Sequence, residues 1–354
     1  MELMPFENPM GIDGFEFVEF AAPDPKVLHE VFHGLGFTPV AKRRRRAVTL
    51  YRQGQCNLLL NAEPDSFASA FAAAHGPSAC GFALRFTRPV REVLHEVLAK
   101  DAREVPGNAD TLAVDTPAID GVGGSALYLV DRYGDRGSLY DDWEWLVPEG
   151  RRHPAGSGLT FIDHLTNNVE LGKMVEWAGF YERLFNFREL HYYDIKGAKT
   201  GLVSKAMTAP DDRVRIPVNE SSDPKSQINE FIEQYHGAGI QHIAIRTDDI
   251  YATVEKMRAA GVAFLDTPDA YFEMIDTRIP NHGEDIPRLA RNKILIDADL
   301  ESRKKILLQI FTQNCIGPIF FEIIQRKGNR GFGDGNFTAL FEAMERDQMQ
   351  RGVL

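Results

Sequence analysis

The stretch HIAIRTDDI, residues 242–250, predicts a strand that ends in polar residues, and the ten residues after it have the apolar spacing of an amphipathic helix. The same order occurs earlier in the chain, where FALRFTRPV, residues 82–90, precedes a predicted helix at residues 90–100. Internal repetition constrains the whole architecture of a chain, so this pair of similar units is the first guide to the fold.

Two more pairs of segments follow the same order. FEFVEFAA at residues 15–22 and FIDHLTNNV at residues 161–169 are each followed by a predicted helix, the second one through residues 174–185. Late in each half, ALYLVDRYG at residues 126–134 lines up with FFEIIQRKG at residues 320–328. Three pairs in one order predict four strand–helix–strands units, two in each half of an α+β chain. Loose matches of this kind also arise by chance in such chains.

The two halves meet at PEGRRHPAGSG, residues 148–158, whose proline, glycine and charged residues are typical of a linker. A chain of 354 residues is long enough for about two domains. We predict an N-terminal domain at residues 1–150 and a C-terminal domain at residues 151–354. The second domain is longer mainly through residues 267–299, which include an extra helical stretch.

The composition restricts the partners and the compartment. Lys and Arg number 40 and Asp and Glu number 51, so the net charge of −11 disfavours nucleic acid or an anionic membrane as the main partner. The basic run KRRRR at residues 42–46 is therefore interpreted as a solvated loop or strand edge. No apolar run approaches the roughly 20 residues of a transmembrane helix, and the acidic N-terminus does not resemble a signal peptide. We expect a cytoplasmic protein, without a disulfide framework because its three cysteines are far apart.

The repeated units differ at three strand positions where the second half has metal-binding residue types and the first half has aromatic ones. The aligned pairs are His164 with Phe17, His242 with Phe82, and Glu322 with Tyr128. Two histidines and one carboxylate from different strands form the facial triad that holds non-haem Fe(II) and leaves positions open. A single histidine on a strand is more often an ordinary core residue, but a glutamate inside the apolar run IFFEII needs a cation.

The second half of the chain resembles the 4-hydroxyphenylpyruvate dioxygenase family of the vicinal-oxygen-chelate superfamily. The longest matching stretch is FFEIIQRKGNRGFGDGNFTALFEAMERDQ at residues 320–348. Shorter matching stretches are LLQIFT at 307–312, GAGIQHI at 237–243, KSQI at 225–228 and PVNE at 217–220. The resemblance extends from residue 161 to the end, and the length is similar to that of the bacterial form.

The resemblance implies tandem βαβββ modules in two domains, each an open, barrel-like mixed sheet flanked by helices. It implies iron in the C-terminal domain alone, with His164, His242 and Glu322 as the ligands. The implied substrate contacts are polar or aromatic side chains, namely Ser204, Asn219, Gln241, Gln309, Asn336, Phe311, Phe320, Phe332 and Phe337. The glycine-rich turn GFGDGNF at residues 331–337 leads into a C-terminal helix, expected to be a lid over the site or, alternatively, a plain packing helix.

The implied activity is the conversion of 4-hydroxyphenylpyruvate and O2 to homogentisate and CO2 with Fe(II), in tyrosine and phenylalanine catabolism. The substrate carries its own α-keto acid, and we also expect a homo-oligomer. Three alternatives stay open. A hydroxymandelate synthase would oxidise the benzylic carbon, and Phe337 disfavours it. An extradiol dioxygenase needs an acid–base histidine and releases no CO2. A non-catalytic binding module lacks a complete ligand set.

Overall fold

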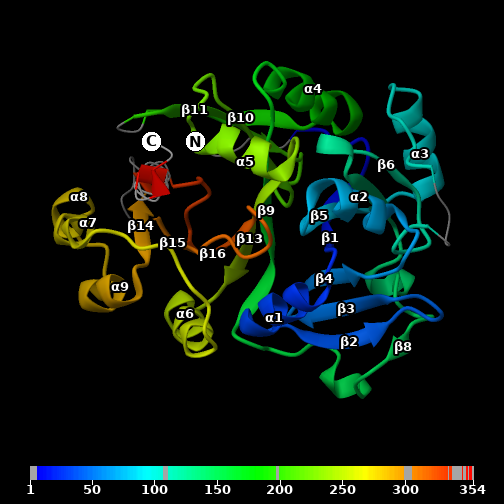
Figure 1. The fold of residues 1–354 in the computed structure, drawn as a ribbon, viewed down its shortest axis with the longest axis horizontal. Helices are drawn as coiled ribbons and strands as arrows, with labels where there is room; N and C mark the ends of the chain where they lie inside the picture. The colour runs from blue at the N-terminus through cyan, green and yellow to red at the C-terminus, as the bar shows by residue number, and fades with distance from the viewer. Residues whose placement is uncertain are drawn as a thin grey trace.

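The computed structural model describes residues 6–106, 111–196, 199–298, 305–333, 335–336, 345, 348–349 and 351–352. Its strands form two eight-stranded mixed sheets, one from each half of the chain, with helices packed against them (Figure 1). This arrangement confirms the predicted α+β class with two open, barrel-like sheets. The division of the chain at residue 150 stays a prediction.

The first half of the chain supplies the first sheet. Its strands are β1 (Ile12–Ala21), β2 (Thr38–Lys42), β3 (Val48–Gln53), β4 (Cys56–Asn61), β5 (Ser78–Phe86), β6 (Ala118–Asp120), β7 (Ala126–Val130) and β8 (Glu144–Trp145). Its α-helices are α1 (Lys26–Gly34), α2 (Phe67–His75) and α3 (Val90–Leu98).

The second half of the chain supplies the second sheet. Its strands are β9 (Leu159–Asn168), β10 (Arg188–Lys196), β11 (Gly201–Thr208), β12 (Arg215–Glu220), β13 (Gly239–Thr247), β14 (Leu295–Ala298), β15 (Ile306–Phe311) and β16 (Phe320–Lys327). Its helices are α4 (Met174–Phe185), α5 (Gln227–Tyr235), α6 (Ile250–Ala259), α7 (Asp269–Glu273), α8 (Ile275–Arg278) and α9 (Ile286–Asn292). The predicted helix at 174–185 is therefore present as α4, and the extra helical stretch is present as α7 to α9.

Both sheets are built around a central antiparallel pair, with one strand from each module. In the first sheet β1 is antiparallel to β5 and parallel to β4, and in the second β9 is antiparallel to β13 and parallel to β12. The order β2–β3–β4–β1–β5–β7–β6 of the first sheet recurs as β10–β11–β12–β9–β13–β16–β15 in the second. The predicted internal repeat is therefore confirmed, while β8 and β14 extend the two sheets at non-equivalent edges.

One apolar core extends between the two sheets. The rings of Phe20 on β1 and Phe321 on β16 have centroids 6.3 Å apart, and those of Phe86 and Phe185 are 6.0 Å apart. A separate apolar cluster around Phe17 fills the other face of the first sheet. Burial of each large apolar side chain contributes about 1.5–3 kcal/mol, so the two halves stabilise each other as well as themselves.

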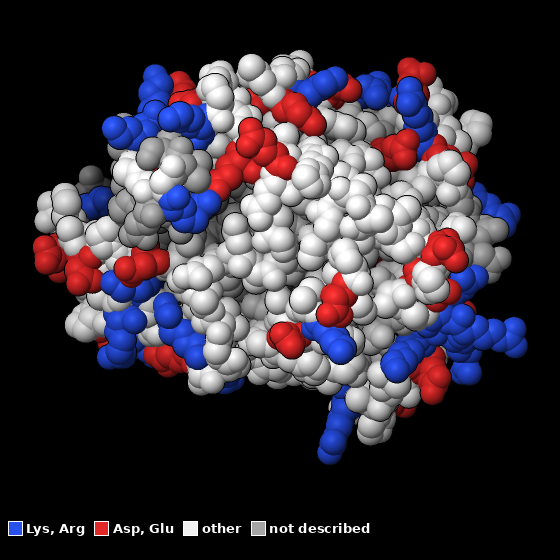
Figure 2. All heavy atoms as spheres, viewed as in Figure 1, with Lys and Arg blue, Asp and Glu red and all other residues white. Residues whose placement is uncertain are grey.

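Further predictions concern the surface of the molecule and the end of the chain. Figure 2 shows acidic and basic side chains intermingled around the rim of one face, with mostly uncharged residues at its centre. Among the described residues, no helix is long and apolar enough to cross a membrane. The predicted C-terminal lid helix lies largely outside the described residues, as does Phe337.

Candidate metal centre

Three adjacent strands of the second sheet bring His164, His242 and Glu322 together. Ala244 of β13 is paired with His164 of β9 on one side and with Glu322 of β16 on the other. Side chains alternate between the two faces of a strand, so His242, two residues before Ala244, lies on the same face as the other two. The small methyl group of Ala244 leaves the space in which the three larger side chains meet.

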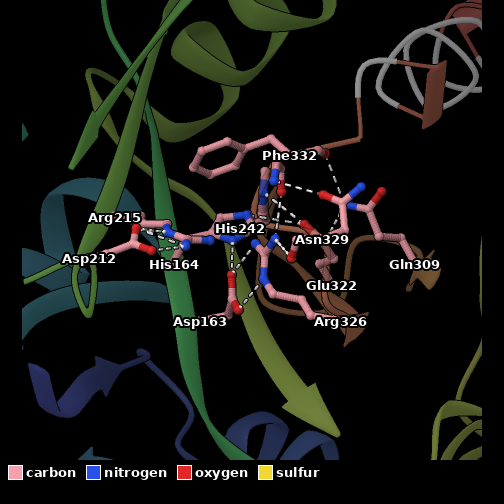
Figure 3. A network of polar contacts seen from close by, with 11 residues as sticks. Asp163, His164, Asp212, Arg215, His242, Gln309, Glu322, Arg326, Asn329 and Phe332 are labelled. Carbon is pink, nitrogen blue, oxygen red and sulfur yellow. Dashed lines mark hydrogen bonds and ion pairs between the residues drawn. The ribbon is translucent and has the colours of Figure 1, made fainter. Parts of the chain in front are cut away.

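The polar atoms of these three side chains converge, as Figure 3 shows. Nε2 of His164 is 3.2 Å and Nε2 of His242 is 3.5 Å from Oε2 of Glu322. All three side chains are buried, with exposed fractions of 2–4%. Within the described ranges they form the only group of three or more His, Cys, Asp or Glu that could hold a metal ion. Two imidazoles and one carboxylate suit a divalent transition metal.

The ionisable groups of the centre shift one another's pKa values. Burial raises the pKa of Glu322, but the two adjacent imidazoles outweigh it and lower the pKa to about 2. Burial lowers the pKa of His164, while the carboxylates of Glu322 and Asp163 raise it by more, so the net shift is upward. Burial dominates at His242 and lowers its pKa. Glu322 is therefore ionised, and available as a ligand, at neutral pH.

Each histidine is held at its other ring nitrogen by the residue before it in the chain. Oδ1 of Asp163 is 2.9 Å from Nδ1 of His164, and Oε1 of Gln241 is 3.1 Å from Nδ1 of His242. These acceptors assign the ring proton to Nδ1, so the lone pair of Nε2 faces the centre. The amide of Gln241 also donates to Oε1 of Gln227 at 2.9 Å. Gln241, predicted as a substrate contact, is thus engaged in holding His242.

The carboxylate of Glu322 is hydrogen-bonded to a second predicted substrate contact. Nε2 of Gln309 donates to Oε1 of Glu322 at 2.7 Å and to the carbonyl oxygen of Phe332 at 3.1 Å. Oε1 of Gln309 accepts from Nδ2 of Asn336 at 2.9 Å, and the hydroxyl of Tyr271 lies 2.8 Å from Oδ1 of Asn336. Gln309 and Asn336 are therefore bonded to each other in this state of the protein.

Aromatic rings cover the centre. Phe332 stands edge-on to the ring of His164, with 5.3 Å between centroids, and Phe320 stacks on His242 at 4.9 Å and 23°. Phe311 packs edge-on against Phe320 at 6.2 Å. These rings exclude water from the centre, which strengthens the electrostatic interactions within it.

A small cavity adjoins the three converging residues. Besides them it is lined by Thr166, Pro217, Gln309, Phe311 and Phe332. Reasoning from the sequence missed Thr166 and Pro217. The period of two along a strand could have found Thr166, because it follows His164 by two residues and shares its face of β9. Pro217 has no polar side-chain atom, so nothing in the chemistry of its side chain marks it as a site residue.

Buried polar atoms continue from the centre along β9, β11 and β12. Within the described residues, Oγ1 of Thr166, Nδ2 of Asn168, Oγ of Ser204 and Oδ1 of Asn219 have no hydrogen-bond partner. Ser204 is paired with Asn219 across the two strands, and Nδ2 of Asn219 donates to Oδ1 of Asn168 at 3.2 Å. An unsatisfied buried polar atom costs about 1–3 kcal/mol, so this row of atoms indicates a surface that binds water or a polar ligand.

The equivalent place in the first sheet has the same register but different residues. Ala83 of β5 is paired with Phe17 of β1 and with Tyr128 of β7, as Ala244 is paired with the two outer residues of the metal centre. Phe17 and Tyr128 thus occupy the positions that the repeats predicted for them. Their rings pack at 5.2 Å between centroids and fill the space.

The third position corrects the alignment of the repeats. The residue two positions before Ala83 is Gly81, so the prediction that His242 corresponds to Phe82 is wrong by one residue. The side chain of Phe82 belongs to the core between the sheets. A Cβ atom at Gly81 would lie 2.7 Å from a backbone oxygen and 3.1 Å from the ring of Tyr128. The tyrosine ring therefore takes the space that an imidazole would need.

Known proteins are similar to this chain in sequence and in fold. Residues 6–144 match the family model of the hydroxyphenylpyruvate dioxygenase N-terminal domain, and residues 162–275 match that of the glyoxalase, bleomycin resistance protein and dioxygenase superfamily. A 4-hydroxyphenylpyruvate dioxygenase from Pseudomonas aeruginosa is 54% identical over 98% of this chain and 97% of its own length. This chain belongs to the 4-hydroxyphenylpyruvate dioxygenase family. A relative of the same name from Legionella pneumophila is 47% identical over 98% of both chains.

Solved structures agree with membership of the 4-hydroxyphenylpyruvate dioxygenase family. A mutant of 4-hydroxymandelate synthase from Streptomyces coelicolor has a TM-score of 0.82 and 26% identity, over 96% of this chain and all of that chain. A fusion of a xylose isomerase-like barrel with a 4-hydroxyphenylpyruvate dioxygenase has a TM-score of 0.81 and 32% identity, over 96% of this chain and 54% of that one. The chain is an enzyme of the dioxygenase family, with a buried His/His/Glu group suited to a metal.

Proposed function

We propose that this chain binds Fe(II) through His164, His242 and Glu322 and converts 4-hydroxyphenylpyruvate and O2 to homogentisate and CO2, in tyrosine and phenylalanine catabolism. The observation that carries the proposal is the convergence of these three side chains in a member of the 4-hydroxyphenylpyruvate dioxygenase family.

The chemistry of the donor set supports a ferrous ion. Two neutral imidazoles and one carboxylate leave half of an octahedral coordination sphere for substrate and O2. A ferrous ion held there would supply a Lewis acid that the carboxylate and keto oxygens of the substrate could chelate, and a redox centre for the reaction with O2. The protein contributes by keeping Glu322 ionised, by directing both Nε2 lone pairs inward, and by excluding water with Phe311, Phe320 and Phe332.

The unsatisfied polar atoms support a place for the substrate. Thr166 adjoins the centre, while Asn168, Ser204 and Asn219 lie further along the same face of the sheet. We assign Ser204 and Asn219 to hydrogen bonds with the substrate, because each has a buried polar atom free to make one. Gln309 and Asn336 can join them once the bond between these two amides opens. Phe332, and Phe337 beyond the described residues, are assigned as apolar walls for the phenol ring.

One assay tests the reaction and separates the alternatives. The protein is incubated with Fe(II), ascorbate and 4-hydroxyphenylpyruvate, and O2 uptake, CO2 release and the product are measured. Homogentisate with one CO2 per O2 supports the proposal. 4-Hydroxymandelate, favoured by the structural likeness to 4-hydroxymandelate synthase, would instead show benzylic oxidation. Absence of both products, with normal Fe(II) binding, would contradict the proposed dioxygenase activity.

The remaining features of the proposal concern the whole chain. We assign residues 151–354 as the catalytic domain and residues 1–150 as a non-catalytic partner, in a cytoplasmic homo-oligomer. The filled space around Phe17 and Tyr128 supports the non-catalytic assignment of the first domain.

A further inference from the structure

An irregularity in the central strand pair directs Asp163 toward its neighbour. Along β9 and β13, Ala244 is paired with His164 but the next residue, Ile245, is paired with Ile162. Asp163 therefore has no partner on β13 and forms a β-bulge. Successive side chains of a regular strand point to opposite faces, whereas a bulge can redirect one of them. Here the bulge allows the carboxylate of Asp163 to reach Nδ1 of His164 at 2.9 Å.

The same arrangement recurs on the other histidine. The register between β9 and β13 shifts again between Ile240 and His242, and the extra residue is Gln241. Oε1 of Gln241 is 3.1 Å from Nδ1 of His242. Each histidine is thus preceded by a bulged residue that binds its Nδ1, but the partner is a carboxylate in one case and a neutral amide in the other.

The carboxylate partner is itself fixed by a buried arginine. Nε and Nη2 of Arg326 donate to the two oxygens of Asp163 at 2.8 and 2.7 Å, and both side chains are 5% exposed. A fork of two parallel hydrogen bonds fixes the plane of a carboxylate as well as its position. Arg326 follows Glu322 on β16 by four residues, and Asp163 lies next to His164 on β9. The ion pair therefore connects β16 with β9, which lie on either side of β13.

The third guanidinium nitrogen connects this pair to the segment that covers the centre. Nη1 of Arg326 donates to the carbonyl oxygen of Gly331 at 2.5 Å and lies 3.4 Å from that of Asn329 (Figure 3). The next residue after Gly331 is Phe332, whose ring stands against His164. Arg326 therefore contacts Asp163, which holds His164. It also contacts the backbone that positions the ring of Phe332 against His164.

We infer that Asp163 and Arg326 are a positioning pair for the metal centre, in which Arg326 orients Asp163 and Asp163 holds His164 with its proton on Nδ1. Neither residue lines the cavity beside the centre. The inference rests on the proposed metal site. Loss of an outer partner of a metal-bound histidine typically lowers metal affinity by about 10–100-fold, without removing a ligand.

The chain offers a matched control in its first sheet. Glu16 is a bulged residue of β1 just before Phe17, as Asp163 is just before His164. Its carboxylate is 2.5 Å from Nε of Arg85, and it is 5% exposed. Arg85→Gln and Arg326→Gln therefore each leave a buried carboxylate without its arginine, but a metal ligand is adjacent to only one of them.

The test measures metal binding and stability separately. Wild-type, Arg326→Gln, Asp163→Asn and Arg85→Gln proteins are titrated with Co(II) against a chromophoric chelator. The visible absorption of bound Co(II) is recorded because it reports the geometry of the ligands, and thermal unfolding is followed without metal. We expect Co(II) affinity to fall by about 10–100-fold and the spectrum to change in Arg326→Gln and Asp163→Asn, with wild-type values in Arg85→Gln.

Two further outcomes decide the inference. Arg326→Lys, which keeps the charge but loses the fork, is expected to restore part of the affinity and also covers the case in which Arg326→Gln does not fold. Wild-type affinity and spectrum in all Asp163 and Arg326 variants would overturn the positioning role while leaving the metal site intact. Failure of the wild-type protein itself to bind Co(II) or Fe(II) would overturn the proposed function instead.

Discussion

At the scale of single residues, Glu322 is the one negative charge among the three proposed ligands. Glu322→Gln keeps the shape of the side chain and an oxygen that can accept from Gln309, so the protein is expected to fold. Fe(II) affinity is expected to fall by more than about 100-fold, beyond the loss typical of an outer partner, and substrate-dependent O2 uptake is expected to cease. Iron content after gel filtration and an oxygen electrode measure the two effects.

A second buried carboxyl provides the control for that variant. Glu19 is fully buried in the first sheet and accepts from Asn61 and Tyr128 at 2.8 and 2.7 Å. Glu19→Gln makes the same chemical change in the half of the chain without the proposed ligands. Normal iron content is expected here, and loss of iron in both variants would point to general unfolding rather than to a missing ligand.

Glu19 also predicts a pH dependence of stability. Burial raises its pKa above the ordinary value of 4.5, even though its hydrogen bonds act in the opposite direction. The folded state therefore binds this proton more tightly than the unfolded state, so its contribution to stability is present at acid pH and is lost as the pH rises above about 4.5. Glu19→Gln removes this loss, so the denaturation midpoint of the variant, relative to that of wild type, is expected to rise as the pH is raised above about 4.5. A difference independent of pH would contradict the shift.

At the scale of elements, β5 and β13 show why the sequence predicts some positions of the site and misses one. Both strands are buried almost throughout, so apolar residues do not alternate and do not fix which face each side chain occupies. Phe17 and Tyr128 could be aligned because strand ends and neighbouring residues match. The pairing with β7 makes Gly81, and not Phe82, the residue that corresponds to His242. No local sequence pattern indicates that pairing.

Gly81 offers a test of that register. Gly81→Ala places a methyl group 2.7 Å from a backbone oxygen, and overpacking of this kind costs typically about 1–3 kcal/mol. Urea unfolding is expected to show this loss of stability, with unchanged metal content. Gly179→Ala in α4, where a Cβ meets nothing within 4 Å, is expected to be neutral or stabilising. Equal effects of the two substitutions would argue against the register described.

The bulges at Asp163 and Gln241 were also beyond prediction from the sequence. A bulge is visible only in the register between two strands. An aspartate or a glutamine that precedes a histidine in the sequence can equally be a surface residue, so its type alone does not show that it holds the histidine. The resemblance placed Gln241 against the substrate, whereas the structure gives its two amide atoms to His242 and Gln227.

At the scale of the whole molecule, the apolar core shared by the two sheets predicts a single unfolding transition. Trp143 and Trp145 lie in the first half of the chain and Trp177 in the second, so tryptophan fluorescence and far-UV circular dichroism report on both. We expect the two signals to coincide on heating. Co(II) at 100 times its dissociation constant should stabilise the entire transition by about 2.7 kcal/mol. Two transitions, of which metal moves only one, would show that the halves unfold independently.

The pairing of the central strands contains a local two-fold symmetry that passes through the metal centre. Leu165 and Ile243 face each other on β9 and β13, and rotation about that point exchanges His164 with His242 and Asp163 with Gln241. The parallel neighbours β12 and β16 are exchanged as well, which places Pro217 opposite Glu322. The two-fold axis thus relates four positions around the centre as two pairs, the two histidines in one pair and Glu322 and Pro217 in the other. Because proline has no donor atom, the fourth position leaves one side of the centre open to a ligand from outside the protein.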